Sequence, residues 1–332
     1  NPNQINWIGA VSTDWYNPNN WSPAQVPTVI DDAIITNAPN KPIITVGGAV
    51  CKNLTINNGS SVTVTTAAGV ADLVVMGDML INGTLNQSST TDFINVGGNW
   101  TKPVIGTVNL NGTIVFDALS GSKTISNGTG LFNTVEFNGP ANFLLGANTT
   151  LKSNLTITQG TLDVTSSNYT LTIRGSFVNN DVFDAKAGLV VLNPTVAGAY
   201  TLNSGGSDFF NLNFTGVAGS SYQLLTNDLA VNGNCNLTSG TLNLNSHSFT
   251  MGDGTGVDIL TITGTVNINQ NAALRLGNNA SVVVNSGGRV IVVGSSSTQL
   301  ATVTRSASSA GRYSFAVNSG ANISAQFYLF EY

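Results

Sequence analysis

One tripeptide, Gly-Thr-Leu, recurs along this chain at nearly constant spacing. Its copies begin at Gly83, Gly160 and Gly240. Self-similarity at a long fixed period is typical of repeat architectures, in which each copy stacks on the next. We therefore predict three long repeats, at about residues 69–145, 146–225 and 226–300.

Within each repeat, short strands alternate apolar and polar residues with a period of two. Residues 61–65, 154–158 and 260–263 follow this pattern, and Asn-Gly or Ser-Gly pairs separate such strands. Alternation places one set of side chains in a core and the other on a surface, whereas Gly and Asn favour turns. A repeat of this length holds about three to four coils of roughly 20–25 residues. The sequence thus predicts an all-β right-handed parallel β-helix, with tandem β-sandwiches as the alternative.

Low charge favours the solenoid. Charged residues make up 8% of the chain, against roughly 25% in ordinary domains. Stacked coils place like side chains beside one another, where charges repel but Asn and Thr do not. The net charge of −5 comes without a basic patch, which argues against nucleic acid as a partner. No apolar run approaches the roughly 18 residues that a membrane-spanning helix requires.

The two ends differ in composition from the middle. Residues 1–45 are expected to cap the first coil, because an open coil exposes strand edges that aggregate. Three of the four tryptophans lie in this segment: Trp7, Trp15 and Trp21. The solenoid is expected over residues 46–300. Residues 301–332 are predicted to form a C-terminal β segment, and we expect the full-length protein to continue beyond it.

The two cysteines lie far apart. About eight coils would separate Cys51 from Cys235, and each coil adds about 4.8 Å. Because a disulfide requires Cα atoms within roughly 7 Å, we expect both thiols to be free and buried as small apolar side chains.

Three segments are similar to parts of large secreted and cell-surface repeat proteins of Bacteroidetes. They are the opening from Trp7 to Ile35, with Trp-Ile-Gly, Asn-Trp-Ser and Val-Pro motifs, the stretch from Lys123 to Val135, and the stretch from Thr304 to Ile323. The resemblance implies an extracellular or cell-surface β-solenoid, exported by the type IX secretion system through a C-terminal sorting domain that this sequence does not show. It implies no catalytic residue.

Some enzymes that degrade polysaccharides are also β-helices, so paired carboxylates in the sequence are candidates for a catalytic site. Such chemistry requires two acids, or an acid cluster with a Lys or Arg base. The best local candidates are Asp181 and Asp184 with Lys186, and Asp72 with Asp78. The scatter of the 16 acidic residues along the chain favours the interpretation that none of them forms a catalytic site.

Calcium is the one cofactor that the sequence suggests. A single Gly-rich segment echoes the Gly-Gly-x-Gly-x-Asp calcium repeat, which makes Asp253 and Asp258 candidate metal ligands. Asp31 and Asp32 form a second candidate pair. Since such sites require tandem copies, a plain Gly-rich turn is favoured. His247 is the only histidine, and we expect it to be a turn residue.

The sequence therefore predicts a structural or adhesive surface module without enzymatic activity. Its expected partner is a cell-surface or extracellular protein or polysaccharide, and self-association through the solenoid ends is a further expectation. The alternatives are a carbohydrate-binding or carbohydrate-degrading β-helix, and an ice-binding solenoid that uses rows of Thr. Repeat-equivalent Phe177, Phe214 and Phe249 are predicted to lie in core stacks, which favours the structural role over exposed sugar platforms.

Overall fold

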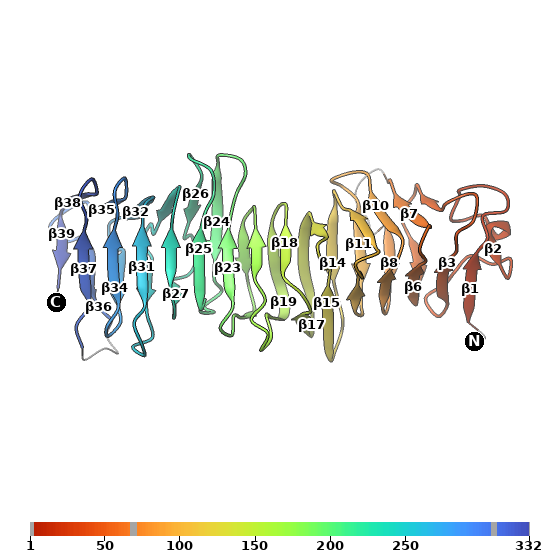
Figure 1. Ribbon diagram of the computed structural model, residues 1–332, viewed down its shortest axis with the longest axis horizontal. Coiled ribbons are helices and arrows are strands. Elements are labelled where there is room, and N and C mark those ends of the chain that lie inside the picture. The colour runs from red at the N-terminus through yellow and green to blue at the C-terminus, as the bar shows by residue number, and fades with distance from the viewer. Residues whose placement is uncertain (1–2, 67–71, 307–310, 332) are drawn as a thin grey trace. The chain divides into compact units, whose positions relative to one another are not determined.

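The computed structural model describes residues 3–66, 72–306 and 311–331, and short β-strands make up nearly all of its regular structure (Figure 1). A three-residue 3-10 helix, η1 (Pro18–Asn20), is the one helical element among these residues. The chain divides into two compact units, residues 1–163 and 164–332.

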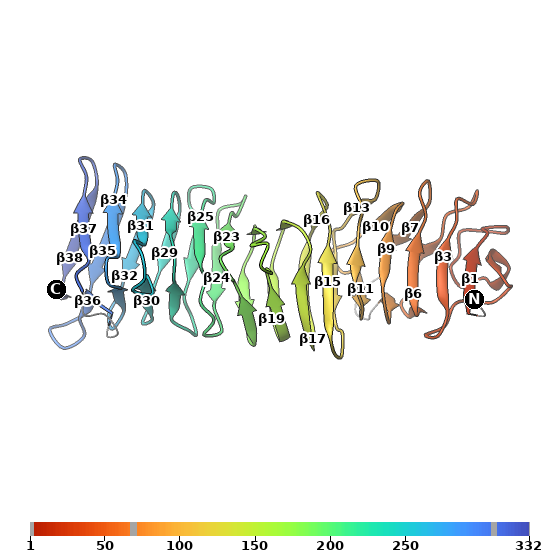
Figure 2. The same ribbon diagram turned by 60° about the horizontal axis from the view of Figure 1, so that its bottom comes forward.

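The first unit is a parallel β-helix whose strands stack side by side (Figure 2), and its chain passes among three faces in a fixed order. The first face holds β1 (Gln4–Trp7), β3 (Asp32–Ile35), β6 (Asn53–Ile56), β9 (Met79–Ile81), β12 (Trp100–Thr101) and β15 (Ser122–Ser126). The second face holds β4 (Ile43–Ile44), β7 (Ser61–Val64), β10 (Thr84–Gln87) and β13 (Thr107–Asn109), followed in the coil order by β16 (Leu131–Phe132) and β18 (Thr149–Leu151). The third face holds β5 (Ala49–Cys51), β8 (Leu73–Val75), β11 (Phe93–Val96) and β14 (Thr113–Phe116).

Two long strands close the first unit. β17 (Thr134–Leu145) pairs with β14 through its first half and with β15 through its second half, so it passes around a corner from the third face to the first. β19 (Leu155–Asp163) repeats this path. On the first face Ile35 lies opposite Ile56, and Ile56 lies opposite Ile81. The separation of these isoleucines along the chain agrees with the predicted coil length.

The second unit also consists of three parallel ladders. One holds β20 (Leu171–Ile173), β23 (Leu189–Leu192), β25 (Asn211–Phe214), β28 (Cys235–Leu237), β31 (Ile259–Ile262), β34 (Ser281–Val284) and β37 (Ser314–Val317). The next holds β21 (Phe177–Asn179), β24 (Ala199–Asn203), β26 (Ser221–Gln223), β29 (Thr241–Asn243), β32 (Thr265–Ile268), β35 (Arg289–Val293) and β38 (Asn322–Gln326). The third holds β27 (Leu229–Val231), β30 (Ser248–Met251), β33 (Ala273–Leu276), β36 (Ala301–Arg305) and β39 (Tyr328–Phe330), and β22 (Val182–Asp184) follows β21 along the chain. The predicted parallel β-helix is confirmed, and the alternative of tandem β-sandwiches is wrong.

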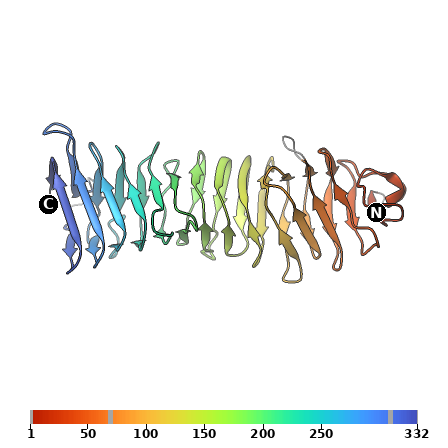
Figure 3. The same ribbon diagram turned by 90° about the horizontal axis from the view of Figure 1, so that it is seen from above.

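An aromatic cluster lies beside the first coil, as predicted. Trp21 makes edge-to-face contacts with Trp7, at 4.9 Å between ring centroids, and with Trp15, at 4.8 Å. All three rings are buried. The short strand β2 (Trp21–Ser22) pairs antiparallel with β1, so the N-terminal segment folds back over the end of the first unit (Figure 3).

Apolar stacks fill the interior of both units. Phe177, Phe214 and Phe249 are all buried, so the prediction that these aromatics belong to the core is confirmed. Cys51 and Cys235 are free and buried, as expected. Burial raises the pKa of both thiols.

Candidate functional site

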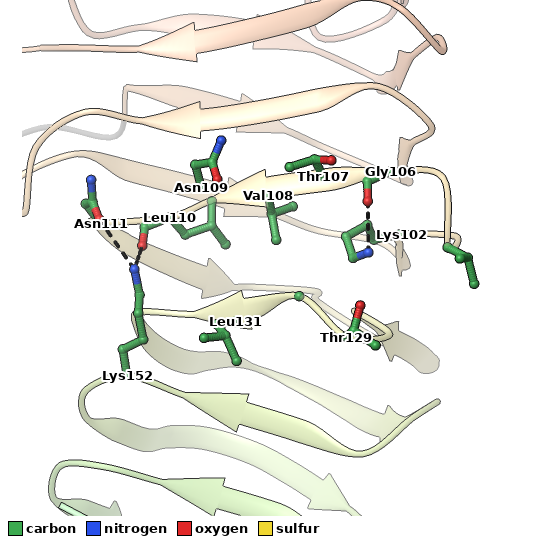
Figure 4. A pocket seen from close by; sticks show the side chains of 12 residues that line it. Lys102, Gly106, Thr107, Val108, Asn109, Leu110, Asn111, Thr129, Leu131 and Lys152 are labelled. Carbon is green, nitrogen blue, oxygen red and sulfur yellow. Dashed lines mark hydrogen bonds between the residues drawn. The ribbon is translucent and has the colours of Figure 1, made fainter. Parts of the chain in front are cut away.

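The second face of the first unit is interrupted at one point. Among the described residues β13 pairs with β10 alone, and β16 pairs with β18, so two strand edges face each other without a shared ladder. An open cleft of about 530 Å³ lies at this break (Figure 4). Ligand sites commonly have volumes of about 300–1,000 Å³. We call this cleft the ladder-break groove, and it is lined by Lys102, Val104, Gly106, Thr107, Val108, Asn109, Leu110, Asn111, Thr129, Gly130, Leu131 and Lys152.

Two glycines shape the walls of the groove. The turn before β16 runs Gly128-Thr129-Gly130, so it supplies a single side chain beside β13. A Cβ atom at Gly130 would lie 2.7 Å from Cγ2 of Val108, and one at Gly106 would lie 2.0 Å from the carbonyl oxygen of Ile81. Both positions therefore favour glycine, because a larger residue would have to displace an atom of a neighbouring coil.

Lys102 marks one end of the groove. It follows β12 directly and is only 5% exposed. The ammonium donates to the carbonyl oxygens of Gly106, at 3.0 Å, and Pro103, at 3.3 Å. Burial lowers the pKa of this ammonium. The side chain is thus a buried cation whose hydrogen-bond acceptors are neutral carbonyls.

Lys152 marks the other end. It directly follows β18 and is half-buried. Its ammonium donates to the carbonyl oxygen of Leu110 and, at 3.4 Å, to Oδ1 of Asn111 (Figure 4). Burial lowers the pKa of this group as well.

The groove is cationic on a chain whose net charge is −5. Its lining contains two lysines and no carboxylate, histidine or cysteine. Within the described residues neither ammonium forms an ion pair. The two ammoniums donate to the carbonyl groups of Gly106 and Leu110. The short extended segment from Gly106 to Leu110 spans about 13 Å. The arrangement suits the binding of an anion and contains no acid–base pair for catalysis.

The structure does not bring the predicted metal-ligand candidates into a cluster. Asp31 accepts hydrogen bonds from the backbone N–H and the hydroxyl of Thr28, and Asp32 accepts one from the Asn53 amide at 2.7 Å. No group of three or more residues able to ligate a metal occurs in the part of the chain that the structure describes.

The other candidate pair, Asp253 and Asp258, lies in the turn after β30. The Asp253 carboxylate accepts from the N–H and hydroxyl of Thr255, at 2.7 and 2.6 Å, and these bonds lower its pKa. Asp258 has a buried Oδ2 without a hydrogen-bond partner within the described residues, and its burial raises its pKa. The two acids thus lie in different environments, one exposed and hydrogen-bonded and the other buried.

The candidate catalytic acids Asp72 and Asp78 connect neighbouring coils. Asp72 is buried and accepts from the Thr66 hydroxyl and, at 2.6 Å, from the N–H of Phe93. Asp78 accepts from the backbone and side-chain N–H groups of Asn99, at 2.8 and 2.9 Å. Both carboxylates are therefore used as hydrogen-bond acceptors between coils.

In the second unit Asp184 forms an ion pair with Lys186. These two residues line a cleft of about 400 Å³ together with Asp208, which accepts from the Asn232 amide at 3.1 Å. Asp181 does not line this cleft. This cleft thus brings two acids and a lysine together, with Asp208 in place of the predicted Asp181.

His247 lies in the turn between β29 and β30, as expected. Its Nδ1 is 3.5 Å from a carboxylate oxygen of Asp228. This contact connects the histidine to the loop before β27.

Sequence reasoning did not find Lys102 and Lys152. They lie far apart along the chain, and only the coil register brings them to one groove. A usable signal exists: each lysine directly follows a short strand, and a Gly-x-Gly turn lies between them.

Fold and groove together define a parallel β-solenoid with a surface cleft. A family model described as a domain of unknown function (DUF8693) matches residues 6–98, which end before the groove. No curated protein and no solved structure matches the chain. Over the residues that the structure describes, no helix has the length and apolar character of a membrane span.

Proposed function

We propose that this chain is a structural or adhesive β-solenoid module of a secreted or cell-surface protein, without catalytic activity. The observation that carries the proposal is the use of polar side chains between coils. Thr63, Asn86 and Asn109 form a row on the second face, where the Asn86 amide donates to Thr63 Oγ1 at 3.2 Å and the Asn109 amide to Asn86 Oδ1 at 2.8 Å. Such rows stabilise neighbouring coils and leave a neutral outer surface.

Similar rows recur in the second unit. The Asn236 amide donates to Asn213 at 2.9 Å, and the Asn318 amide donates to Asn285 at 2.8 Å. A rigid scaffold with long neutral faces is suited to spacing or contact. Secretion by the type IX system rests on the sequence resemblance alone, and self-association through the solenoid ends is part of the proposal.

Carbohydrate binding is the second candidate function, and the ladder-break groove favours it. Carbohydrate degradation has less support, because Asp184 is paired with Lys186 and the acids Asp72 and Asp78 bond to neighbouring coils. Ice binding is not favoured, because the register places Asn86 beside Thr63 and so interrupts the Thr row.

The test combines an adhesion assay with an activity screen. Purified chain, coupled to beads, is expected to adhere to surfaces coated with extracellular polysaccharide or surface protein. In parallel, acidic and neutral polysaccharides are incubated with the chain while reducing ends and unsaturated uronate products are measured. Sustained product release that disappears in Asp208→Asn would contradict the non-catalytic proposal. Failure to adhere to any coating would contradict the adhesive role and leave only the structural one.

A further inference from the structure

The two lysines of the ladder-break groove occupy positions that a neighbouring strand would otherwise fill. The N–H of Thr107 donates to the carbonyl oxygen of Gly83, so Thr107 faces β10. Alternate residues of a strand in a sheet direct their backbone groups to opposite neighbours, and Gly106 and Leu110 therefore face the groove. Lys102 and Lys152 donate to the carbonyl oxygens of these two residues.

This arrangement argues against addition of a peptide strand. An incoming strand would need the carbonyl acceptors of Gly106 and Leu110, which are already occupied. Lysines on exposed strand edges are also a known protection against such pairing. The occupant of the groove must therefore use the ammonium groups themselves, and not the strand edge.

Each ammonium retains capacity for a ligand. A lysine ammonium has three N–H donors, and each of these two has two protein acceptors. A buried cation without a carboxylate partner is costly, and an anion bound to the remaining donor offsets that cost. The absence of acids in the lining means that nothing in the groove competes with such an anion.

The lining between the lysines is neutral and rich in hydrogen-bonding groups. Thr107, Asn109 and Thr129 are exposed and supply hydroxyls and an amide. The polar row that begins at Thr63 ends at Asn109, whose amide donates to Asn86. Val104, which is 98% exposed, adds an apolar contact. Hydroxyl, amide and small apolar groups between two cations suit a ligand that carries both hydroxyls and separated negative charges.

We propose that the ladder-break groove binds an acidic polysaccharide whose carboxylate or sulfate groups contact Lys102 and Lys152. The inference rests on the proposed adhesive function and names its ligand class. Anionic groups about 13 Å apart along an extended chain would reach both ammoniums. The polymer lies across the face, and its hydroxyls contact Asn109 and Thr129.

The test measures binding of four polymers to the full chain by calorimetry: polygalacturonate, dextran sulfate, neutral dextran and polyglutamate. Binding of one or both anionic polysaccharides is expected, and which one binds distinguishes carboxylate from sulfate recognition. Lys152→Gln and Thr129→Glu should each weaken binding about tenfold, the effect of losing one charge-assisted hydrogen bond or introducing a repulsive charge. Lys52→Gln, an equal change of charge at an exposed lysine outside the groove, should have no effect.

Lys102→Gln is the sharpest variant but removes a buried group, so its fold is checked by circular dichroism. If it does not fold, Lys152→Gln and Thr129→Glu decide the matter, because both positions are more exposed. Equal binding of neutral dextran, equal affinity in all variants, or binding of polyglutamate alone would each overturn the inference. Adhesion that persists in Thr129→Glu would separate the two proposals, since the adhesive function would stand while the groove assignment fell.

Discussion

The aromatic cluster around Phe116 offers a direct test of how the first unit is held together. Phe116 is fully buried on the third face. Its ring stacks on Phe137, with 5.3 Å between centroids, and also contacts Trp100, Phe132 and Phe143 at 6.1–6.3 Å. Residues from several successive coils thus meet at one ring.

Phe116→Ala should lower the free energy of unfolding by about 3–5 kcal/mol. Burial of a Phe side chain contributes about 1.5–3 kcal/mol, and aromatic pairs add about 0.5–1.5 kcal/mol each, though not additively. The cavity left behind raises the cost into the range measured for Phe→Ala in protein cores. A closely packed solenoid interior has little freedom to collapse around the missing ring.

Urea unfolding followed by tryptophan fluorescence and circular dichroism gives the measurement. Leu119→Ala is the control, because Leu119 lies nearby along the chain and is 82% exposed; it should change the free energy by less than about 0.5 kcal/mol. Since solenoids can unfold in parts, the two probes must give coincident transitions before a free energy is assigned. A loss below about 1 kcal/mol for Phe116→Ala would refute the role of the aromatic cluster.

Three further predictions concern buried polar groups. At pH 8 a thiol reagent should not label Cys51 or Cys235 in the folded chain, because both thiols are buried and burial raises their pKa. Both should react fully in denaturant, and rapid labelling of the folded chain would contradict the prediction. Asp258→Asn should stabilise the fold by about 1 kcal/mol at pH 7, because the raised pKa of Asp258 means that folding disfavours its charged form. The gain should fade as pH falls from the raised pKa of the folded chain towards 3.8, the ordinary pKa of an aspartate. A gain that does not depend on pH would show that the stabilisation has another cause. Asp72→Asn should destabilise the fold by about 1.5–3 kcal/mol in urea unfolding, because the carboxylate accepts hydrogen bonds from the Thr66 hydroxyl and the Phe93 N–H. An unchanged free energy of unfolding would mean that these two bonds make no net contribution to stability.

The solenoid was predictable because its signal is repeated many times. The alternation of apolar and polar residues recurs in strand after strand, and the turns between them carry Gly and Asn. The coil length follows from the long repeat, and the register of Ile35, Ile56 and Ile81 agrees with it. The tryptophan cap was equally predictable, because three of the four tryptophans lie near one end of the repeats and the end of a repeat array requires a cap.

The groove was not predictable, because it arises where the repeat fails. Successive coils along the first face differ slightly in length, and the position of the break on the second face depends on such small differences. Lys102 and Lys152 each follow a short strand, with a Gly-x-Gly turn between them, but this signal alone does not place them in one groove. Their meaning comes from the carbonyl groups of Gly106 and Leu110, which no pattern of side chains reveals.

The acids show how the sequence could have been interpreted further. Asp32 bonds to Asn53, and Asp78 bonds to Asn99, and in each pair the two residues are 21 positions apart. This separation is one coil, so an Asp with an Asn one coil later is a signature of a bond between neighbouring coils. A carboxylate beside an amide avoids the repulsion that two stacked acids would suffer. Among the described residues, Lys102 and Lys152 have no such carboxylate partner in a neighbouring coil, because the groove provides them with neutral carbonyls and no carboxylate. This missing partner makes the groove a site for an anion.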